Sequence, residues 1–201
     1  MENLSTKMIH EIVFVTSNKG KIQSAMQFLD DSIHLETYNF DIEEPEINDI
    51  DYIAEYKVKQ AYKKVGKPCI SLDAGFYIKN YPNNPNFPGA FPKRELLEKI
   101  GIEGLLEKMK GVTNRNCYFK ECLAYYDGNN VKKFYGTSYG SLSTEIKGNY
   151  NKKQWSELWF VFIPKNHEKT LAEMTDEERK NRNDGHTSPF VPFYKWLINN
   201  R

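Results

Sequence analysis

Two kinds of chemical group recur between residues 16 and 73: side chains that can donate hydrogen bonds to phosphate, and carboxylates. Hydroxyl, amide and ammonium groups supply hydrogen-bond donors and positive charge, whereas carboxylate oxygens are the ligands that hard divalent cations prefer. Together, groups of these two kinds can hold a polyphosphate and the cation that accompanies it. The candidate donors are Thr16, Ser17, Asn18, Lys21 and Lys57, and the candidate carboxylates are Glu46 and Asp73.

Most of the donors lie in one short turn, residues 16–21. The preceding residues, 12–15, are apolar and mostly β-branched, which is typical of a buried parallel strand. Apolar side chains then recur at helical spacing over residues 22–29. A helix start offers unpaired N–H groups that favour phosphate, but the Walker pattern GxxxxGK[ST] is absent. Two interpretations stay open: a phosphate-binding turn, or a plain strand-to-helix turn with a solvated lysine.

Lys57 interrupts the apolar face of a second predicted helix. That helix covers about residues 51–65 and is ended by Gly66, with Pro68 beyond it. The helical spacing of the apolar residues predicts an apolar side chain at position 57. A lysine on such a stripe either extends to the edge of the apolar surface or meets an anion.

Asp73 follows a short apolar segment, residues 69–72, which we predict to be a buried strand. A carboxylate at the C-terminal end of a strand in an α/β sheet points into the usual ligand crevice, and Gly75 permits a tight turn there. The alternative is an aspartate that only caps the turn. Asp73 is therefore the strongest single candidate for catalysis or metal binding.

The composition restricts the class of protein. The chain has 201 residues, a formal net charge of +1 and three cysteines. We expect residues 1–201 to form one domain, without the charge excess that draws proteins to nucleic acid or membranes. No apolar run approaches the roughly 20 residues of a membrane-spanning helix, and the N-terminus is too polar for a secretory signal. An odd number of cysteines fits a reducing compartment, so we expect a cytoplasmic protein.

Further elements follow from periodicity and turn residues. Asp127-Gly128 joins two strand-like segments and predicts a hairpin, in which Gly136 and Gly140 mark bulges or close backbone approach. Residues 77–93 are rich in proline and asparagine and predict a long ordered loop or a flap. We expect strands at 32–40, 116–126, 131–142 and 158–163, and helices at 96–100, 102–109, 170–180 and 190–198.

Taken in order, these residues resemble the inosine triphosphate pyrophosphatases, which hydrolyse non-standard purine nucleoside triphosphates. The family's T-x-N-x-x-K turn, its proline–glutamate pair, its helical lysine and its strand carboxylate all have counterparts here. Each motif is loose, but the ordered set spans nearly the whole chain. The matching residues are Thr16, Asn18, Lys21, Pro45-Glu46, Lys57, Asp73, Pro88-Gly89-Ala90-Phe91, Gly136, Gly140, Thr170 with Ala172-Glu173-Met174, and Lys180-Asn181.

The resemblance implies a fold and a reaction. The fold is α/β: an elongated, twisted mixed β-sheet flanked by helices, with two lobes around a central cleft. The reaction yields a nucleoside monophosphate and pyrophosphate from a nucleoside triphosphate, requires Mg²⁺, with Mn²⁺ as a possible replacement, and is carried out by a homodimer. In this chain Asp73 activates water, Glu46 and Asp73 hold the metal, and the substrate-binding residues are Thr16, Ser17, Asn18, Lys21, Lys57, Lys180 and His186.

The chain also departs from the family. Leu72 replaces the first of two adjacent carboxylates, and the family's S-H-R becomes Gly185-His186-Thr187, with Arg182 the nearest arginine. The family's F-G-[WY]-D-P segment is not kept in residues 154–160. There the side chains able to stack on a base are Trp155, Trp159 and Phe160, of which we expect at least two in the core.

These departures leave two alternatives: a related pyrophosphatase with a different base specificity, or a nucleotide-binding module without activity. The second is disfavoured because Lys21, Glu46, Lys57 and Asp73 are kept together. Nucleic-acid binding is a weaker possibility, since no recognised fingerprint is present.

Overall fold

A seven-stranded mixed sheet runs the length of the molecule, as the sequence analysis expected. The structure is a computed structural model, and it describes residues 10–150, 154 and 156–200. β1 pairs in parallel with β2 and β3, and the remaining pairs are antiparallel, in the order β2-β1-β3-β5-β6-β7 with β4 on β3. The strands are β1 (His10–Val15), β2 (Ile33–Tyr38), β3 (Cys69–Ile78), β4 (Phe87–Gly89), β5 (Asn116–Tyr126), β6 (Val131–Leu142) and β7 (Phe162–Pro164).

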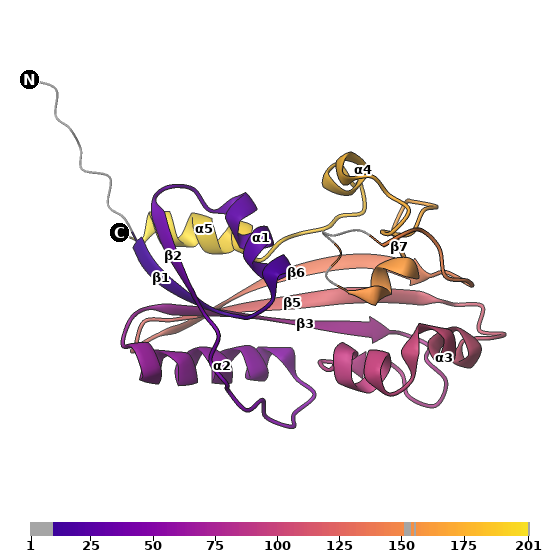
Figure 1. Cartoon of the computed structure of the whole chain (residues 1–201), viewed down its shortest axis with the longest axis horizontal. Helices are drawn as coiled ribbons and strands as arrows, with labels where there is room; N and C mark the ends of the chain where they lie inside the picture. Colours follow the sequence, from indigo (N-terminus) through magenta and orange to yellow (C-terminus); the bar gives the residue numbers. More distant parts are fainter. Residues whose placement is uncertain (1–9, 151–153, 155, 201) are drawn as a thin grey trace, which may run out of the picture.

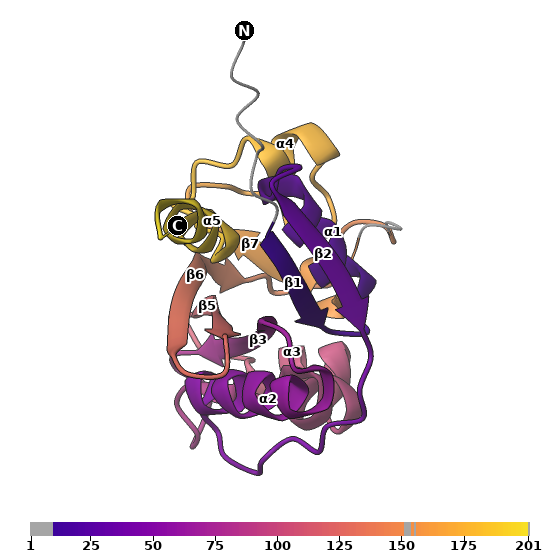
Figure 2. The same ribbon diagram turned by 90° about the vertical axis from the view of Figure 1, so that its left-hand side faces the viewer.

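Helices flank the sheet at both of its ends. Near the termini, α1 and α5 lie on one side and α2 on the other, whereas α3 and α4 lie at the opposite end (Figures 1 and 2). In the part of the chain that the structure describes, no helix is long and apolar enough to cross a membrane. The helices are α1 (Lys19–Phe28), α2 (Ile50–Val65), the π-helical η1 (Pro92–Glu98), α3 (Gly101–Lys108), the 3-10 helix η2 (Glu157–Phe160), α4 (Asp176–Lys180) and α5 (Phe190–Asn199).

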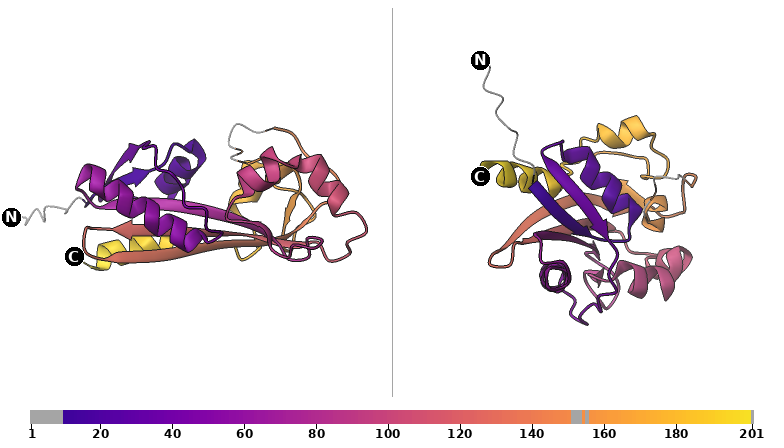
Figure 3. Two further views of the ribbon diagram at one scale, coloured as in Figure 1. Left: turned by 90° about the horizontal axis from the view of Figure 1, so that it is seen from below. Right: turned by 60° about the vertical axis from the view of Figure 1, so that its left-hand side comes forward.

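The buried side chains divide the molecule into two lobes. At the end with the termini, one core lies between the sheet and α1 and α5, and another lies beneath α2. The second lobe has its own core, called the distal core here, which contains Phe76, Phe119 and Trp159. β3 and β5 belong to both lobes, and seen from below the long strands connect the two ends (Figure 3).

The predicted hairpin is confirmed, with β5 and β6 at the expected residues. Their register is continuous from Asn116↔Ser141 to Tyr126↔Val131, so neither glycine of β6 forms a bulge. The alternative, close backbone approach, is the correct one. A Cβ on Gly136 would lie 2.6 Å from the Thr187 carbonyl oxygen, and a Cβ on Gly140 would clash with the Ile163 carbonyl oxygen. Both glycines therefore let a neighbouring segment pack directly on the sheet.

One prediction for the middle of the chain was wrong. β3 does not end at Asp73 but continues to Ile78, because it pairs along its whole length with β5, a strand distant in sequence. The expected long ordered loop, residues 77–93, contains turns after β3 and then the short strand β4, which pairs back on β3.

Two predictions for the C-terminal third also needed correction. The expected strand 158–163 is the 3-10 helix η2 followed by β7, and the Ser156 hydroxyl caps η2 by accepting the Leu158 N–H at 3.2 Å. The expected helix 170–180 begins only at Asp176. A reciprocal capping box between Thr175 and Glu178 fixes that start.

Candidate active site

The candidate site forms where β1 stops pairing with β3. The two strands pair only at Val13↔Cys69 and Phe14↔Ile70, so the edge of β3 is open beyond Ile70. Lys21 uses this opening: its Nζ donates to the Leu72 carbonyl oxygen at 2.5 Å. The opening therefore lies beside the middle of β3, where pairing with its parallel neighbour β1 has ended.

The turn that carries Lys21 is shaped by its own polar side chains. The Asn18 side-chain oxygen accepts the N–H groups of Gly20 at 2.9 Å and Lys21 at 3.2 Å, which caps α1. The Thr16 hydroxyl accepts the Asn18 N–H at 3.1 Å. Ser17 is exposed in the same turn. Thr16 and Asn18 thus hold the backbone of the turn in place beside the open edge of β3.

Lys57 meets anions, as one of its two interpretations predicted. Its Nζ lies 3.0 Å from Asp73 Oδ1 and 2.8 Å from Glu44 Oε1. Burial lowers the pKa of Lys57, but the charges of Asp73 and Glu44 outweigh burial and leave the pKa above its usual value. Asp73 is 8% exposed, and its Oδ2 is buried with no hydrogen-bond partner among the described residues. That oxygen can accept a proton or bind a cation.

Both lysines act on the same carboxylate. Burial lowers the pKa of Lys21, and the positive charge of Lys57 lowers it further. The negative charge of Asp73 acts in the opposite direction. Glu44 and Glu121 also act on this pair of lysines, so the charges of the two ammonium groups are countered by carboxylates in a poorly solvated place. Both ammonium groups can still donate to the oxygens of an anionic ligand.

Glu46 is paired with Arg94 in this structure, and no hydrogen bond or ion pair joins it to Asp73 in the described part of the chain. Arg94 donates to both of its carboxylate oxygens, at 2.6 and 2.8 Å, and stacks over the Phe91 ring with its guanidinium carbon 4.2 Å from the ring centre. The carboxylate connected to Asp73, through Lys57, is Glu44. Within residues 10–150, 154 and 156–200, no three His, Cys, Asp or Glu side chains form a ready metal site.

A Mg²⁺ ion nevertheless fits the donors that are present. Mg²⁺ takes one or two protein carboxylates and completes its shell with water and phosphate oxygens. The unpartnered Asp73 Oδ2 provides one ligand, and Glu44 and Glu46 are the nearby candidates for a second. Mn²⁺ prefers the same oxygen donors.

The C-terminal candidates are His186 and Lys180, of which His186 lies beside Asp184 and Arg182. His186 donates its backbone N–H to Asp184 at 2.9 Å, and Asp184 also forms an ion pair with Arg182 at 3.5 Å. Desolvation lowers the pKa of His186, and the Arg182 charge lowers it further. Lys180 ends α4 and is exposed, and no contact in the described part of the chain connects it to Asp73.

Glu121 is a residue of this site that the sequence analysis missed. It lies in β5 opposite Ala74 and Gly136, and the charges that act on it are those of Lys21 and Arg182. Burial raises the pKa of Glu121 to about 7, against the pull of both cations. One signal could have found it: Cys117, Phe119 and Leu123 share its face of the strand, and Glu121 is the only charged residue in that apolar alternation.

The proposed stacking residues are only partly described. Trp159 is 7% exposed and packs in the distal core beneath Arg179, whose guanidinium carbon lies 5.2 Å from the ring centre. Phe160 is half-buried, and Trp155 lies outside the described residues. Trp159 thus has a structural role here.

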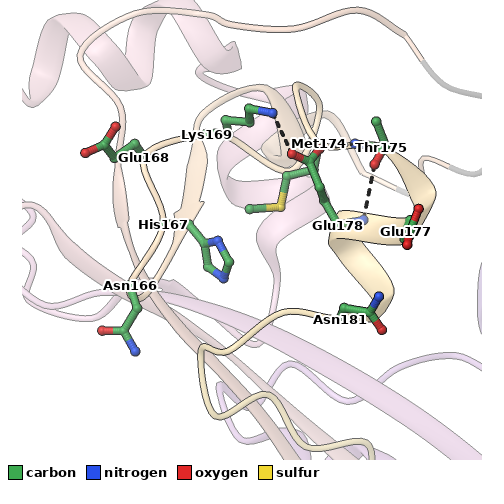
Figure 4. A pocket seen from close by; sticks show the side chains of 9 residues that line it. All are labelled: Asn166, His167, Glu168, Lys169, Met174, Thr175, Glu177, Glu178 and Asn181. Carbon is green, nitrogen blue, oxygen red and sulfur yellow. Dashed lines mark hydrogen bonds and ion pairs between the residues drawn. The ribbon is translucent and has the colours of Figure 1, made fainter.

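A cavity of about 610 Å³ opens at the distal end, between the segment after β7 and α4. Figure 4 shows its polar lining, in which Lys169 pairs with Glu178 at 2.6 Å. None of the residues around Asp73 or Lys21 lines it. The cavity is lined by Asn166, His167, Glu168, Lys169, Met174, Thr175, Glu177, Glu178 and Asn181.

Comparison with known proteins gives a consistent result. The Ham1 family model matches residues 12–185. A dITP/XTP pyrophosphatase of Pyrococcus horikoshii is 31% identical over 189 residues, covering 93% of this chain and 96% of that protein. The corresponding protein of Thermococcus kodakarensis is 32% identical over 193 residues, covering 94% and 98%. The solved structure of the Staphylococcus aureus Ham1 protein shares the fold, with a TM-score of 0.78 at 21% identity, covering 95% of this chain and all of that chain.

Proposed function

The chain belongs to the Ham1 family, and from this membership we propose that it hydrolyses a non-standard purine nucleoside triphosphate to the monophosphate and pyrophosphate. The observation that carries the proposal is the group formed by Lys21, Lys57 and Asp73 at the open edge of β3. Two ammonium groups there can donate to phosphate oxygens, and one carboxylate oxygen of Asp73 has no hydrogen-bond partner among the described residues. Relatives named dITP/XTP pyrophosphatase supply the substrate class.

In the proposed mechanism the lysines and the turn bind phosphate, and Asp73 acts on the water. Lys21 and Lys57 neutralise phosphate oxygens, and the turn of Thr16, Ser17 and Asn18 presents donors to them. Asp73 accepts a proton from the water that attacks the phosphorus, so that the anhydride between the α- and β-phosphates breaks. The proposed contacts to the rest of the nucleotide come from Lys180 and His186.

The same proposal assigns a divalent cation to this site. Asp73 and Glu46 would hold Mg²⁺, or Mn²⁺ in its place, which requires Glu46 to leave Arg94. When bound, the cation supplies further positive charge to the phosphate oxygens. Glu44 is an alternative second ligand, because Lys57 already holds it beside Asp73. Comparing Glu46→Gln with Glu44→Gln in a Mg²⁺ titration distinguishes the two, since only loss of a ligand raises the Mg²⁺ concentration needed for half-maximal rate.

The decisive experiment is pyrophosphate release from a panel of standard and modified nucleoside triphosphates, with and without Mg²⁺. The substitution Asp73→Asn removes the general base and should lower kcat by at least about 100-fold, the usual contribution of such a group. Asp127→Asn is the matched control, because Asp127 caps the distant hairpin turn by accepting the N–H groups of Asn129 and Asn130, as an amide oxygen also can.

Metal-dependent release that Asp73→Asn abolishes and Asp127→Asn preserves is the expected result. Release only from other nucleotides supports the second candidate, a different base specificity, which is favoured by Gly185-His186-Thr187 and by the structural role of Trp159. Nucleotide binding without any turnover contradicts the enzyme proposal and indicates a binding module.

We further propose a homodimer in the cytoplasm, without nucleic-acid or membrane partners. The net charge of +1 offers no general attraction to polyanions, and all three cysteines are buried free thiols, as suits a reducing compartment. A tyrosine ladder across β3, β5 and β6 supports the dimer. In it Tyr77 stacks on Tyr118 at 4.9 Å, Tyr118 lies 5.7 Å from Tyr139, and Tyr139 is 45% exposed.

A further inference from the structure

A single long side chain occupies the boundary between the two lobes on one face of the sheet. Across three adjacent strands the facing residues are Ala74, Glu121 and Gly136. In β5, the next residue on this face toward the termini is Leu123, and the next one toward the distal core is Phe119. Ala74 and Gly136 are too small to cover the carboxylate of Glu121, and the segment of Thr187 and Pro189 packs over Gly136 beside it.

Glu121 makes no hydrogen bond and no ion pair with any residue that the structure describes. Its charged neighbours, Lys21 and Arg182, act on it through space. A Cβ on Gly136 would lie 3.0 Å from Glu121 Oε2 and 2.6 Å from the Thr187 carbonyl oxygen, so the carboxylate reaches toward the segment that carries His186. Glu121 therefore lies between the phosphate-binding turn and the C-terminal segment.

Two roles are excluded by charge and by register. A carboxylate beside Lys21 repels phosphate, so Glu121 does not bind the polyphosphate itself. Asp73 faces the opposite side of the sheet, because its register partner is Cys122, the residue after Glu121. The two carboxylates consequently do not share one metal ion. What an ionised carboxylate can still do is accept hydrogen bonds from hydroxyl or N–H groups.

We propose that Glu121 is a specificity-determining residue that accepts a hydrogen bond from a hydroxyl or N–H group on the nucleoside portion of the substrate. Lys21, on one side of it, holds the phosphates, and the nucleoside extends from there toward the segment of Arg182 and His186. This inference rests on the proposed function. The donor is a sugar hydroxyl or an N–H of the base, since both present the same chemistry to a carboxylate.

The test compares the wild type with Glu121→Gln and Glu121→Ala, using ITP, dITP, XTP and GTP as substrates and inorganic pyrophosphate as an inhibitor. Loss of a hydrogen bond to a charged acceptor is expected to lower kcat/KM for the preferred substrate about 10- to 100-fold. Inhibition by pyrophosphate should be unchanged or tighter, because the variants remove a negative charge beside Lys21. Glu103→Gln, on an exposed residue of α3, is the matched control.

The substrate that lacks the donor identifies it. If the loss disappears with dITP, the donor is the 2′-hydroxyl; if it persists with dITP but differs among the bases, the donor belongs to the base. Equal losses with all four nucleotides place the donor on a group that they share, the 3′-hydroxyl or the N1–H of the base. No loss with any nucleotide, or a parallel loss of pyrophosphate inhibition, would overturn the inference while leaving the proposed function intact.

Equilibrium binding of the same nucleotides separates the inference from the proposed function. If the wild type shows no turnover, the proposed function fails, but the inference still requires the Glu121 variants to bind nucleotide about 10-fold or more weakly and pyrophosphate no more weakly. Unchanged nucleotide affinity contradicts it. Circular dichroism melts establish that each variant is folded.

Discussion

At the scale of single residues, the site depends on charges that are kept poorly solvated. Lys57 is held between Asp73 and Glu44, and Lys21 reaches a backbone carbonyl that β1 leaves unpaired. One Asp73 oxygen is occupied by Lys57 and the other has no hydrogen-bond partner in the described part of the chain. Groups held this way are preorganised for a polyanion, because little reorientation is needed when it arrives.

Glu121 allows a prediction about stability. Burial raises its pKa in the folded protein to about 7 from an ordinary value of 4.5, so the folded state binds the proton more tightly than the unfolded chain. The stability that this proton contributes is complete below about pH 4.5 and is lost as the pH rises through about 7. The side chain introduced by Glu121→Gln cannot ionise. The difference in free energy of unfolding between this variant and the wild type should therefore shift by about 2 kcal/mol in favour of the variant from pH 5 to pH 8.

Urea unfolding at the two pH values measures this difference. Glu103→Gln, on the exposed face of α3, should track the wild type at both. A constant offset between Glu121→Gln and the wild type at pH 5 and pH 8 is incompatible with a raised pKa.

At the scale of elements, the site is created by the end of one strand and the start of one helix. β1 ends at Val15, which exposes the edge of β3, and α1 begins at Lys19 with Asn18 as its cap. The cap turns the chain so that Lys21 points to Leu72. The end of β1 and the Asn18 cap together therefore determine where Lys21 lies.

Asn18 provides the prediction for this scale. Asn18→Ala removes the cap and should lower the free energy of unfolding by about 1 kcal/mol and reduce kcat/KM, because the turn loses its shape. Asn18→Ser keeps a capping oxygen, so it should recover most of both quantities. Chemical denaturation and steady-state kinetics measure them. If Asn18→Ser recovers stability but no activity, the Asn18 amide contacts substrate directly and the cap alone does not explain its role.

At the scale of the whole molecule, two lobes are joined by strands that belong to both. β3 contributes Leu72 to one core and Phe76 to the other, and β5 does the same with Leu123 and Phe119. This sharing supports the proposal that residues 1–201 form one domain. It also places the boundary between the lobes at Asp73, Ala74 and Glu121, where the reaction is proposed to occur.

The proposed homodimer is tested at the tyrosine ladder. Tyr139→Glu places a charge on its exposed end and should shift the protein from dimer to monomer, since an unpaired charge buried in an interface is costly. Sedimentation velocity measures the distribution. Tyr150→Glu, at a residue that is 75% exposed, is the control and should remain dimeric. A wild type that is monomeric at all concentrations contradicts the proposal, and an unaffected Tyr139→Glu dimer places the interface elsewhere.

Local sequence determined the elements whose signals are local. The Asp127-Gly128 hairpin, the helix that ends at Gly66 and the turn after β1 follow from turn residues and periodicity, which act over a few positions. Lys57 was recognisable for the same reason, because a lysine on an apolar helical face needs an anion or the solvent. The ordered motifs added the family, which the comparisons confirm.

Tertiary structure decided what depends on residues distant in sequence. Pairing with β5 carries β3 past Asp73, Arg94 pairs with Glu46, and the packing of other elements on the sheet brings the charges of Lys21 and Arg182 to Glu121. No local pattern encodes these contacts, because they depend on where a neighbouring strand stops and which faces align. The sequence by itself therefore determined which groups are available for chemistry, whereas the fold decided which of them meet.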